Sequence, residues 1–448
     1  VSRMEWLSES PVAVVCWWWI LDGTRYEIRD SCKLNSHLSH ALQAGWKASW
    51  YWNESGLDAI DWMEWDELIE RSNRPSLFLD SRMVRSLLSS KTRNVAALMW
   101  HVEGQLKGIS FVEDAEAESV NLSGHLESRS FVFDTVSSLL HGRSGRLKFS
   151  VRVMGTTLGS GDHGFRFAPD VSYKQQQYCV ESTMFHSASN WGNRIPRVVM
   201  AKDTVIRDGA SKSALFPGWT PMEFDPEMIV HLDPLWNTLE DCMPSLVTKS
   251  RTKFKRILSL SEDFVIEMWS LEQLEEEGHE LIELYRLVFE RSGFRLGSLH
   301  LEELIESKRF WGEAFVVSVY VLEGKRVGFQ CAYVTSDATE AFFVGFKPEL
   351  TKSHAIYQRM LLEFIQLGIT AGSKEVHMGR TALDVKSSIG ALPRRLQCDV
   401  KFRNPLFHAV VNAFTKRFSP LPPVLKRPWK TSSYPLERQS EINAVHPS

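Results

Sequence analysis

The sequence lacks the cysteine spacing that a disulfide framework or a zinc site requires. Its 448 residues include six cysteines, which lie far apart and form no CxxC pair and no cysteine–histidine zinc pattern. They are Cys16, Cys32, Cys179, Cys242, Cys331 and Cys398. This spread excludes a disulfide-stapled secreted domain, and we expect a reduced, cytoplasmic protein without a metal.

An apolar run long enough to cross a membrane is also missing. The run near the start, at 12–20, is far shorter than the roughly 20 residues that a spanning helix needs. It has no basic leader and no small-residue cleavage site. We interpret it as a buried strand and expect neither a signal peptide nor an anchor.

Neither sign of charge is in large excess, since the formal net charge is -3. The molecule as a whole should therefore not attract DNA or anionic lipid, and any basic site must be local. Hydrophobic residues make up 43% of the chain, which excludes global disorder. The length exceeds the about 100 to 200 residues of an ordinary domain, so two domains are expected.

The second half carries the clearer secondary-structure signals, because its apolar residues recur with strand or helix periodicity. The expected elements are a strand at 264–269, helices at 271–291 and 299–310, hairpin strands at 315–322 and 327–334, a third strand at 340–346, a helix at 355–367 and a strand at 374–378.

The first half repeats part of this order with weaker signals. The expected elements are a helix at 77–90, strands at 95–102, 106–112 and 119–122, a helix at 131–141 and a strand at 147–154. Two residue matches accompany the order: Glu103-Gly104 with Glu323-Gly324, 220 positions apart, and 154–157 (MGTT) with 378–381 (MGRT), 224 apart. The similar offsets favour an internal duplication over chance.

Three segments carry a resemblance to a known family: 245–257 (SLVTKSRTKFKRI), 285–295 (YRLVFERSGFR) and 379–396 (GRTALDVKSSIGALPRRL). With the element order, they make the chain resemble the GNAT acyltransferases over 226–403, and more faintly over 77–167. The more specific resemblance is to the FemAB-like branch, whose members carry two GNAT-like halves.

The resemblance implies an α/β (α+β mixed sheet) fold of two tandem GNAT-like domains, each with a central, mostly antiparallel sheet flanked by helices. We expect an N-terminal domain at 1–170, a connecting segment at 171–222, a C-terminal acyltransferase domain at 223–430 and a disordered tail at 431–448.

The implied activity is N-acyl transfer: an acetyl or aminoacyl group moves from acyl-CoA or aminoacyl-tRNA to an amine, in a setting such as cell-envelope or surface-polysaccharide synthesis. No covalent enzyme intermediate is expected, because there is no nucleophile elbow or cysteine–histidine site. The alternative is a non-catalytic, degenerate GNAT pair that binds a sugar-linked or peptide ligand.

The expected donor site departs from the family pattern. Many GNAT enzymes bind the CoA pyrophosphate with a glycine-rich loop at a helix N-terminus. This chain has no glycine there, but Lys352 could add charge and Ser353 stands beside it. Acyl-CoA as co-substrate and aminoacyl-tRNA both stay open.

The segment after the strand at 374–378 offers two cations. Arg380, which follows Gly379, could grip a carboxylate or phosphate with two hydrogen bonds, or form a structural ion pair with Asp384. Lys386 could hold a phosphate or carbonyl oxygen, or be a solvated lysine.

Two residues at the start of the helix at 355–367 are candidates for proton transfer. His354 could be a general base, because a helix N-terminus disfavours imidazolium, or it could be a surface histidine beside the cap. Tyr357 could protonate a leaving thiolate or hydroxyl, or could simply be packed.

A glycine-rich loop in the first half, 159–164, contains Asp162 and His163. The pair could orient an imidazole at a substrate site that backbone can approach closely. The glycines could equally make a tight turn.

Basic residues cluster on a predicted helix in the second half: Lys249, Arg251, Lys253, Lys255 and Arg256. They could bind CoA phosphates, a tRNA backbone or a lipid-linked pyrophosphate, or form a solvated face. A second basic segment, 416–430, could rest on a membrane surface or pack on the core.

Overall fold

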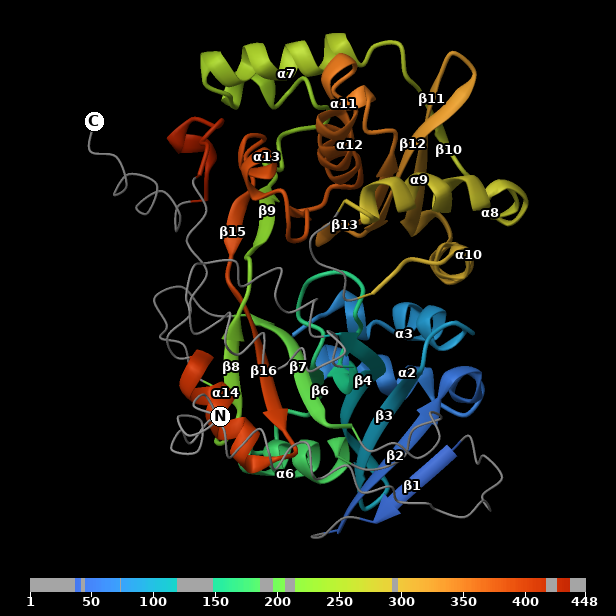
Figure 1. Ribbon diagram of the computed structural model, residues 1–448, viewed down its shortest axis with the longest axis vertical. Coiled ribbons are helices and arrows are strands. Elements are labelled where there is room, and N and C mark those ends of the chain that lie inside the picture. The colour runs from blue at the N-terminus through green and yellow to red at the C-terminus, as the bar shows by residue number, and fades with distance from the viewer. Residues whose placement is uncertain are drawn as a thin grey trace, which may run out of the picture.

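The computed structural model describes residues 37–41, 45–72, 74–118, 148–185, 196–205, 214–291, 297–415 and 425–435. These residues form two β-sheets with helices packed against them, each sheet built mainly from one half of the chain (Figure 1). Most neighbouring strands are antiparallel, as the expected fold class requires. The expected strands at 12–20 and 119–122 and the helix at 131–141 lie outside the described residues.

The sheet of the second half has the strand order β10-β11-β12-β13-β14-β9-β15. Its strands are β9 (Glu227–His231), β10 (Val265–Met268), β11 (Phe315–Leu322), β12 (Lys325–Val334), β13 (Ala338–Phe346), β14 (Glu375–His377) and β15 (Leu392–Arg394). Its helices are α7 (Thr248–Leu260), α8 (Leu271–Glu277), α9 (His279–Phe289), α10 (Leu301–Trp311), α11 (Leu350–Ser353), α12 (Ile356–Ala371) and α13 (Leu383–Ser387). The order strand, helices, three antiparallel strands, helix and parallel strand is the one that the GNAT resemblance implies.

The sheet of the first half has the order β1-β2-β3-β4-β5-β7-β16-β8, and β6 pairs with β4. Its strands are β1 (His37–Ala41), β2 (Trp46–Trp52), β3 (Val95–Val102), β4 (Gln105–Glu118), β5 (Lys148–Met154), β6 (Phe165–Phe167), β7 (Val198–Val205), β8 (Thr220–Glu223) and β16 (Leu396–Phe402). Helices α2 (Trp62–Arg71), α3 (Ser81–Leu88), α6 (Tyr173–Met184) and α14 (Pro405–Thr415) accompany it.

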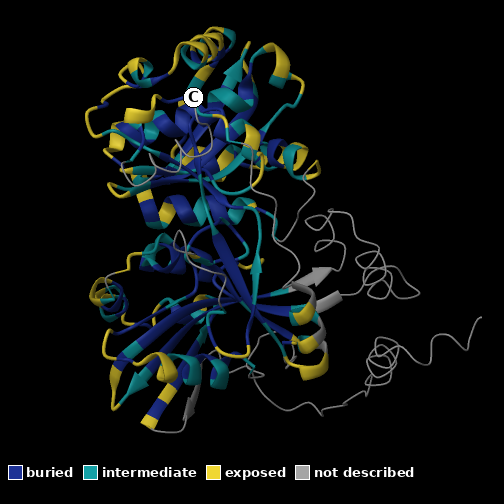
Figure 2. Cartoon of the chain, turned by 90° about the vertical axis from the view of Figure 1, so that its left-hand side faces the viewer, coloured by how far each residue is buried: buried dark blue, intermediate teal, exposed yellow. Residues whose placement is uncertain are grey.

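The chain crosses between the sheets more than once. The segment 171–222, expected as a connection, supplies α6, β7 and β8, and the late strand β16 returns to pair with β7 and β8 (Figure 1). Buried residues run continuously through both halves (Figure 2), and one hydrophobic cluster holds residues of both. Buried Arg93 reinforces this join, because its guanidinium contacts Glu113 at 2.7 Å and Glu303, on α10, at 3.0 Å.

The two halves share one hairpin in detail. Glu103 and Gly104 have φ of 51° and 81°, and Glu323 and Gly324 have φ of 50° and 74°. Two consecutive positive φ angles define the tight turn that joins twisted antiparallel strands. The strand register also shifts just after Trp100 and again 220 residues later, after Tyr320. This part of the predicted repeat is confirmed.

The second residue match is wrong as a structural equivalence. Strand β5 is antiparallel to β4 and parallel to β7, just as β13 is antiparallel to β12 and parallel to β14. Met154 therefore ends the counterpart of β13, whereas Met378 follows β14. The misleading similarity is a short Met-Gly pair after a strand, which either strand can carry.

The pairing registers identify equivalent residues. Val153 pairs with Met200 in the first half, and Glu340 pairs with His377 in the second. The registers of β5 on β4 and of β13 on β12 place Val153 and Glu340 at equivalent positions. Counting three residues past Met200 and His377, Asp203 on β7 is the counterpart of Arg380.

The third strands differ at one level. In the second half, β13 has a one-residue irregularity beside Cys331 and Ala332. At the equivalent position in the first half, the chain leaves the sheet after Met154 and returns to it as β6. The loop 155–164 therefore replaces the one-residue irregularity of β13. The two features meet: a Cβ on Gly159 would lie 3.5 Å from the ring of Phe342.

Candidate functional site

The candidate site lies at the edge where the parallel β13–β14 pair ends. Pairing stops at Glu340 and His377, although β13 continues to Phe346 against β12. In open α/β sheets, ligands bind beyond the carboxyl ends of parallel strands, where the chain leaves the sheet. Gly379 and Arg380 occupy that edge.

The loop after β14 has an unusual backbone. Gly379, Thr381 and Ala382 all have positive φ, of 65°, 68° and 49°. Such a conformation costs a residue with a side chain about 1 to 2 kcal/mol, and it persists where surrounding contacts fix it. The loop therefore presents Arg380 in a fixed orientation.

Arg380 contacts the first half of the chain rather than α13, the helix that follows it. Its guanidinium forms an ion pair with the buried carboxylate of Asp203, at the equivalent position of the other sheet. The expected alternative partner, Asp384, instead binds Lys426. The interpretation of Arg380 as an ion-paired residue is therefore correct in kind but wrong in partner.

Asp203 makes several contacts where the two sheets meet, a region that we call the junction and that contains Asp203, Arg380, Lys202 and His163. Its carboxylate accepts hydrogen bonds from the Gly161 amide at 3.2 Å and the Cys398 thiol at 3.5 Å, and lies 3.4 Å from Lys202 Nζ. These partners come from the loop 155–164, from β16 and from β7. The cations and hydrogen bonds hold the pKa of Asp203 below its usual value, although burial opposes them.

His163 lies fully buried in the same cluster. Lys202 Nζ lies 2.9 Å from His163 Nε2 and donates to the Gly159 carbonyl at 2.7 Å. The imidazole stacks on Phe78, with ring centroids 3.7 Å apart. Burial first, and then the nearby cations Lys202 and Arg380, place the pKa of His163 well below 6.5, so this histidine is neutral.

Asp162 does not orient the imidazole of His163. It pairs with Arg74 at 2.6 Å and with Arg166 at 3.1 Å. The expected Asp–His pair is therefore replaced by a contact of His163 with Lys202. The glycine-rich loop nevertheless brings His163 to the junction.

Lys386 folds back onto the loop that precedes it. Its Nζ donates to the carbonyl oxygens of Arg380 at 2.6 Å and Gly379 at 3.3 Å. Burial lowers the pKa of Lys386 to about 7, with Glu227 acting in the opposite direction. Lys386 is thus a buried amine and not the solvated lysine of the alternative interpretation.

The residues around the N-terminus of α12 form a second group at this end of the sheet. His354 Nδ1 lies 2.9 Å from Ser353 Oγ, and its ring packs on Phe264. Tyr357 stacks on Phe346, and burial raises its pKa to about 12. In the described part of the chain, no hydrogen bond or ion pair joins His354 or Tyr357 to Arg380 or Lys386.

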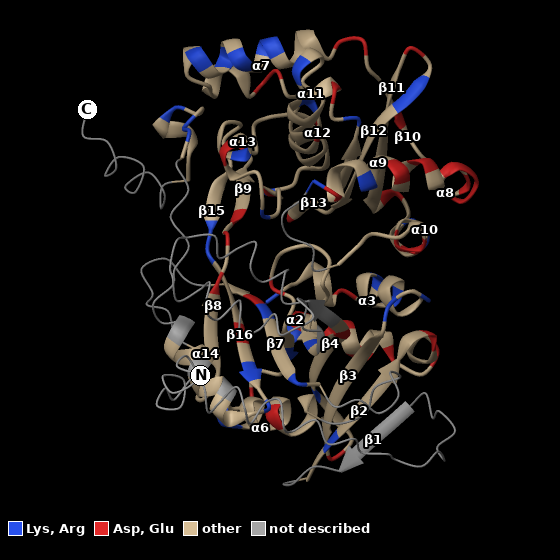
Figure 3. Ribbon diagram, in the orientation of Figure 1, with Lys and Arg blue, Asp and Glu red and all other residues tan. Residues whose placement is uncertain are grey.

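The cluster of basic residues on α7 is divided between structural and exposed roles (Figure 3). Arg251 donates to the carbonyls of Met243 and Leu246 at 3.0 and 3.1 Å, and Lys253 donates to Ser388 Oγ at 2.7 Å. Lys249, Lys255 and Arg256 are exposed, and Lys253 is exposed as well despite its contact with Ser388.

A polar cluster on the second sheet escaped the sequence interpretation. His377 lies between two carboxylates, with Nδ1 2.9 Å from Glu340 and Nε2 3.0 Å from Glu375. Glu375 also contacts His231 at 3.0 Å, and Glu227 binds Arg394. Burial disfavours a charged imidazole, but the carboxylates outweigh it and raise the pKa of His377 to about 10.

The cluster and the junction were hard to find in the sequence for a specific reason. Glu227, Glu340 and His377 come from three strands that are neighbours in the sheet but far apart in the sequence, and Asp203 lies in a stretch interpreted as a connection. The signal that could have revealed them is a charged residue beside an apolar strand segment. Glu227 precedes the apolar segment MIV, and Glu340 precedes the apolar segment AFFV.

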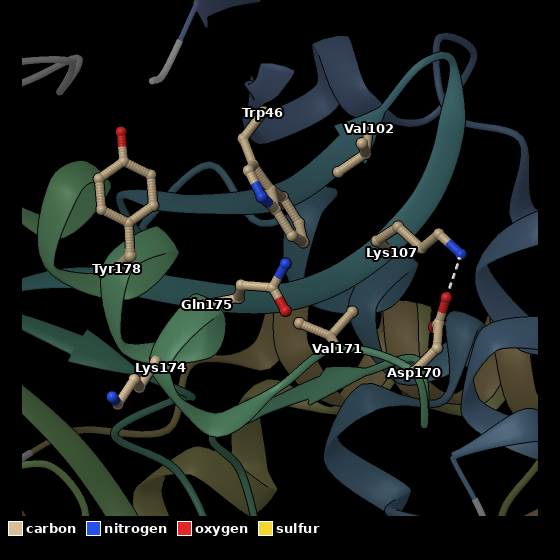
Figure 4. A pocket seen from close by; sticks show the side chains of 8 residues that line it. All are labelled: Trp46, Val102, Lys107, Asp170, Val171, Lys174, Gln175 and Tyr178. Carbon is tan, nitrogen blue, oxygen red and sulfur yellow. Dashed lines mark hydrogen bonds and ion pairs between the residues drawn. The ribbon is translucent and has the colours of Figure 1, made fainter. Parts of the chain in front are cut away.

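A hollow of about 500 Å³ lies elsewhere, between α6 and the first sheet (Figure 4). Its lining includes Trp46, Tyr178 and Gln175, and a Lys107–Asp170 ion pair of 2.6 Å closes one side. None of the residues predicted for the site lines this hollow. Among the described residues, no helix has the length and apolar character to cross a membrane.

Comparison with known proteins finds similarity only among solved structures. No family model matches the sequence. No curated protein matches it either. The chain is similar to the structure of FemX, at 9% identity and a TM-score of 0.45, over 79% of this chain and 98% of that one.

Two further structures are similar to a comparable extent. A tandem GNAT protein from the clavulanic acid biosynthesis pathway is 9% identical, with a TM-score of 0.43 over 80% of this chain and 99% of its own. A conserved protein of unknown function from Bacteroides thetaiotaomicron is 9% identical, with a TM-score of 0.44 over 76% of this chain and 97% of its own.

Proposed function

We propose that this chain is an N-acyltransferase that moves an acyl group from a phosphate-bearing donor to an amine. The observation that carries the proposal is the end of the β13–β14 pair, where strand pairing stops and the constrained Arg380 loop follows. Both halves contribute to this edge through the Arg380–Asp203 ion pair.

The N-terminus of α12 is the proposed position of the donor phosphates. The residue that caps this helix, Ala355, has a left-handed backbone with φ of 48°, and no side chain caps the first turn. Free backbone N–H groups and the positive end of the helix dipole favour an anion here. Lys352 lies one short turn before this end and adds a positive charge.

The chemical step is direct attack of the acceptor nitrogen on the donor carbonyl. A carbon–nitrogen bond forms, the bond from the carbonyl to the donor sulfur or oxygen breaks, and the nitrogen loses a proton. Lys386, with a pKa of about 7, is our candidate to take that proton. Tyr357, which burial keeps protonated, is the candidate to protonate the leaving atom.

We favour acyl-CoA over aminoacyl-tRNA as the donor. Arg251 is occupied by backbone carbonyls and exposed Lys253 donates to Ser388, so α7 offers only part of its charge to a ligand. The remaining exposed cations suit a few phosphates better than a long nucleic-acid backbone, whose binding grows with the number of phosphates neutralised. Cell-envelope or surface-polymer synthesis is the proposed setting, with the basic segment at 416–430 as a membrane contact.

A specific observation supports binding without turnover as the second candidate. Arg380 is paired with Asp203, and Lys386 donates to two backbone carbonyls, so neither cation is open to a ligand unless these contacts exchange. A degenerate pair that holds a sugar-linked or peptide ligand would need no such exchange.

Calorimetric titration of the full chain with acetyl-CoA and longer acyl-CoAs tests the donor site. The variant Lys352→Glu should weaken binding about tenfold, because it reverses a charge beside the proposed phosphate position. Lys374→Glu is the control, since Lys374 is also exposed but follows the other end of α12, where it pairs with the exposed Asp337. Absence of saturable binding at millimolar acyl-CoA, or equal weakening in both variants, would overturn this donor site.

A further inference from the structure

We infer that Glu227, Glu340 and His377 form a binding site for a divalent transition-metal cation on the second sheet. One potential ligand atom from each residue lies within 4.8 Å of the other two. The residues come from β9, β13 and β14, the three adjacent strands at the point where the parallel pairing ends. This inference is independent of the acyl-transfer proposal.

Two buried oxygens in this cluster lack partners, and they distinguish it from an ordinary group of acidic residues. Glu227 is fully buried and Glu340 is 4% exposed. In the described chain, Oε1 of each is buried without a hydrogen-bond partner. A buried carboxylate oxygen without a donor costs free energy, and a metal ion would satisfy both oxygens at once.

Hydrogen bonds from neighbouring side chains fix the orientation of the proposed ligands, as they do in known metal sites. His377 Nε2 lies 3.0 Å from Glu375, which leaves Nδ1 to face the cluster, and Arg394 Nε binds Glu227 Oε2 at 3.0 Å. A histidine ligand generally donates its other ring N–H to a carboxylate, and ligating carboxylates are themselves hydrogen-bonded. Glu340 Oε2, now 2.9 Å from Nδ1, is the contact that the cation would replace.

The charges also match a divalent cation. Once His377 has released the proton that it holds between Glu340 and Glu375, as an imidazole ligand must, Glu227, Glu340 and Glu375 carry three negative charges and Arg394 carries one positive charge. The surplus of two negative charges equals the charge of the ion.

The first half supplies a built-in comparison. By strand register, the counterparts of Glu340, His377 and Glu375 are Val153, Met200 and Val198. These three residues belong to one apolar cluster with Val400 and Phe402. Since the same sheet position folds with apolar residues alone, the fold does not require buried charges there, and a bound ion accounts for them.

The ligand chemistry selects the kind of metal. Two carboxylates and one imidazole suit zinc and its transition-metal neighbours, whereas magnesium prefers oxygen ligands alone. Zinc–ligand bonds are about 2.0 to 2.2 Å long, and the three candidate ligand atoms already lie within 4.8 Å of one another. The ion can enter from the side where His231 and Glu375 are 26% and 30% exposed.

Calorimetric titration of the untagged full chain with zinc chloride, after removal of metals by a chelator, tests the site. We expect saturable binding of one ion per chain, weakened at least tenfold in Glu227→Gln and in Glu340→Gln. Glu227→Gln retains an oxygen for Arg394, so it should remain folded. The visible absorption of bound Co²⁺ should report an imidazole ligand and should change in His377→Gln.

Glu363→Gln is the matched control, because Glu363 is a buried carboxylate on α12 with its own partner, Arg359. Its zinc affinity should equal that of the unaltered protein. No saturable binding, or binding that Glu227→Gln and Glu340→Gln leave unchanged, would overturn the inference. Because the titration contains no acyl donor, such a result would leave the acyl-transfer proposal standing.

Discussion

The two halves share a hairpin and a parallel strand pair, yet they fill one equivalent position in opposite ways. In the first half that position holds valines, a methionine and a phenylalanine. In the second half it holds Glu340, His377, Glu375 and His231. Buried charges are costly unless they are paired, so the difference indicates that the second half keeps them for a purpose other than folding.

The comparison also explains how the halves join. Asp203 and Arg380 occupy equivalent positions, three residues beyond Met200 on β7 and His377 on β14, carry opposite charges and bind each other. Residues that a duplication would have made identical have become complementary. The junction therefore depends on the difference between the halves as much as on their likeness.

The largest expected effect is the loss of this ion pair. Asp203→Ala would leave Arg380 and Lys202 close together without their shared anion, and removing one member of a buried pair costs about 3 to 5 kcal/mol. Urea unfolding measures the change. Asp170→Ala, which removes an exposed ion pair with Lys107, is the control and should change little. Equal losses in both variants would contradict the proposed role of Asp203.

A smaller effect should follow when the second half is made to resemble the first. Glu340→Val combined with His377→Met should leave the free energy of unfolding unchanged or raise it by about 1 to 4 kcal/mol in metal-free protein, because apolar groups replace buried charges. Urea unfolding with chelator present measures it. A loss of several kcal/mol would mean that the charges support the fold, and the contrast between the halves would lose its meaning.

The pH dependence of the free energy of unfolding should report on His163, the buried histidine of the junction. The pKa of His163 is far below its unfolded value because of burial, Lys202 and Arg380, while Asp203 Oδ2, 3.8 Å away, opposes this shift. Below about pH 6.5 the unfolded chain binds a proton that the folded chain does not, so stability falls as pH falls, by about 1.4 kcal/mol per pH unit.

Replacing this histidine should remove that slope. The free energy of unfolding of His163→Asn, measured between pH 7 and pH 5, should depend less steeply on pH than that of the unaltered protein. His279→Asn is the control, because His279 is exposed. If both variants keep the full slope, His163 is not neutral in the folded protein.

The smallest effect should be the same in both halves. Gly104 and Gly324 have φ of 81° and 74°, and a Cβ at either would meet nothing within 4 Å. Alanine should therefore cost about 1 kcal/mol at each position through backbone strain alone. Thermal unfolding of both variants measures it, and clearly unequal losses would break the equivalence of the hairpins.

The sequence predicted what depends on local pattern. The hairpins were visible because Glu-Gly turns separate alternating apolar strands, and Arg380 was visible because it follows a strand end. The partner of Arg380 lies 177 positions earlier in the chain, and β16 pairs with a sheet built mostly from the first half. Such pairings depend on long-range topology, which periodicity does not encode.

The metal ligands illustrate the same limit. Cysteine and histidine spacing does not indicate this cluster, because it consists of two glutamates and one histidine from separate strands. Only the register of β9, β13 and β14 brings them together.

The most direct test of acyl transfer at the junction is release of free CoA thiol from acetyl-CoA in the presence of a panel of amines. We expect amine-dependent release that Arg380→Met abolishes, with the folded state of the variant checked by circular dichroism. Saturable acetyl-CoA binding without release for any amine, or full release by Arg380→Met, would contradict acyl transfer at the junction.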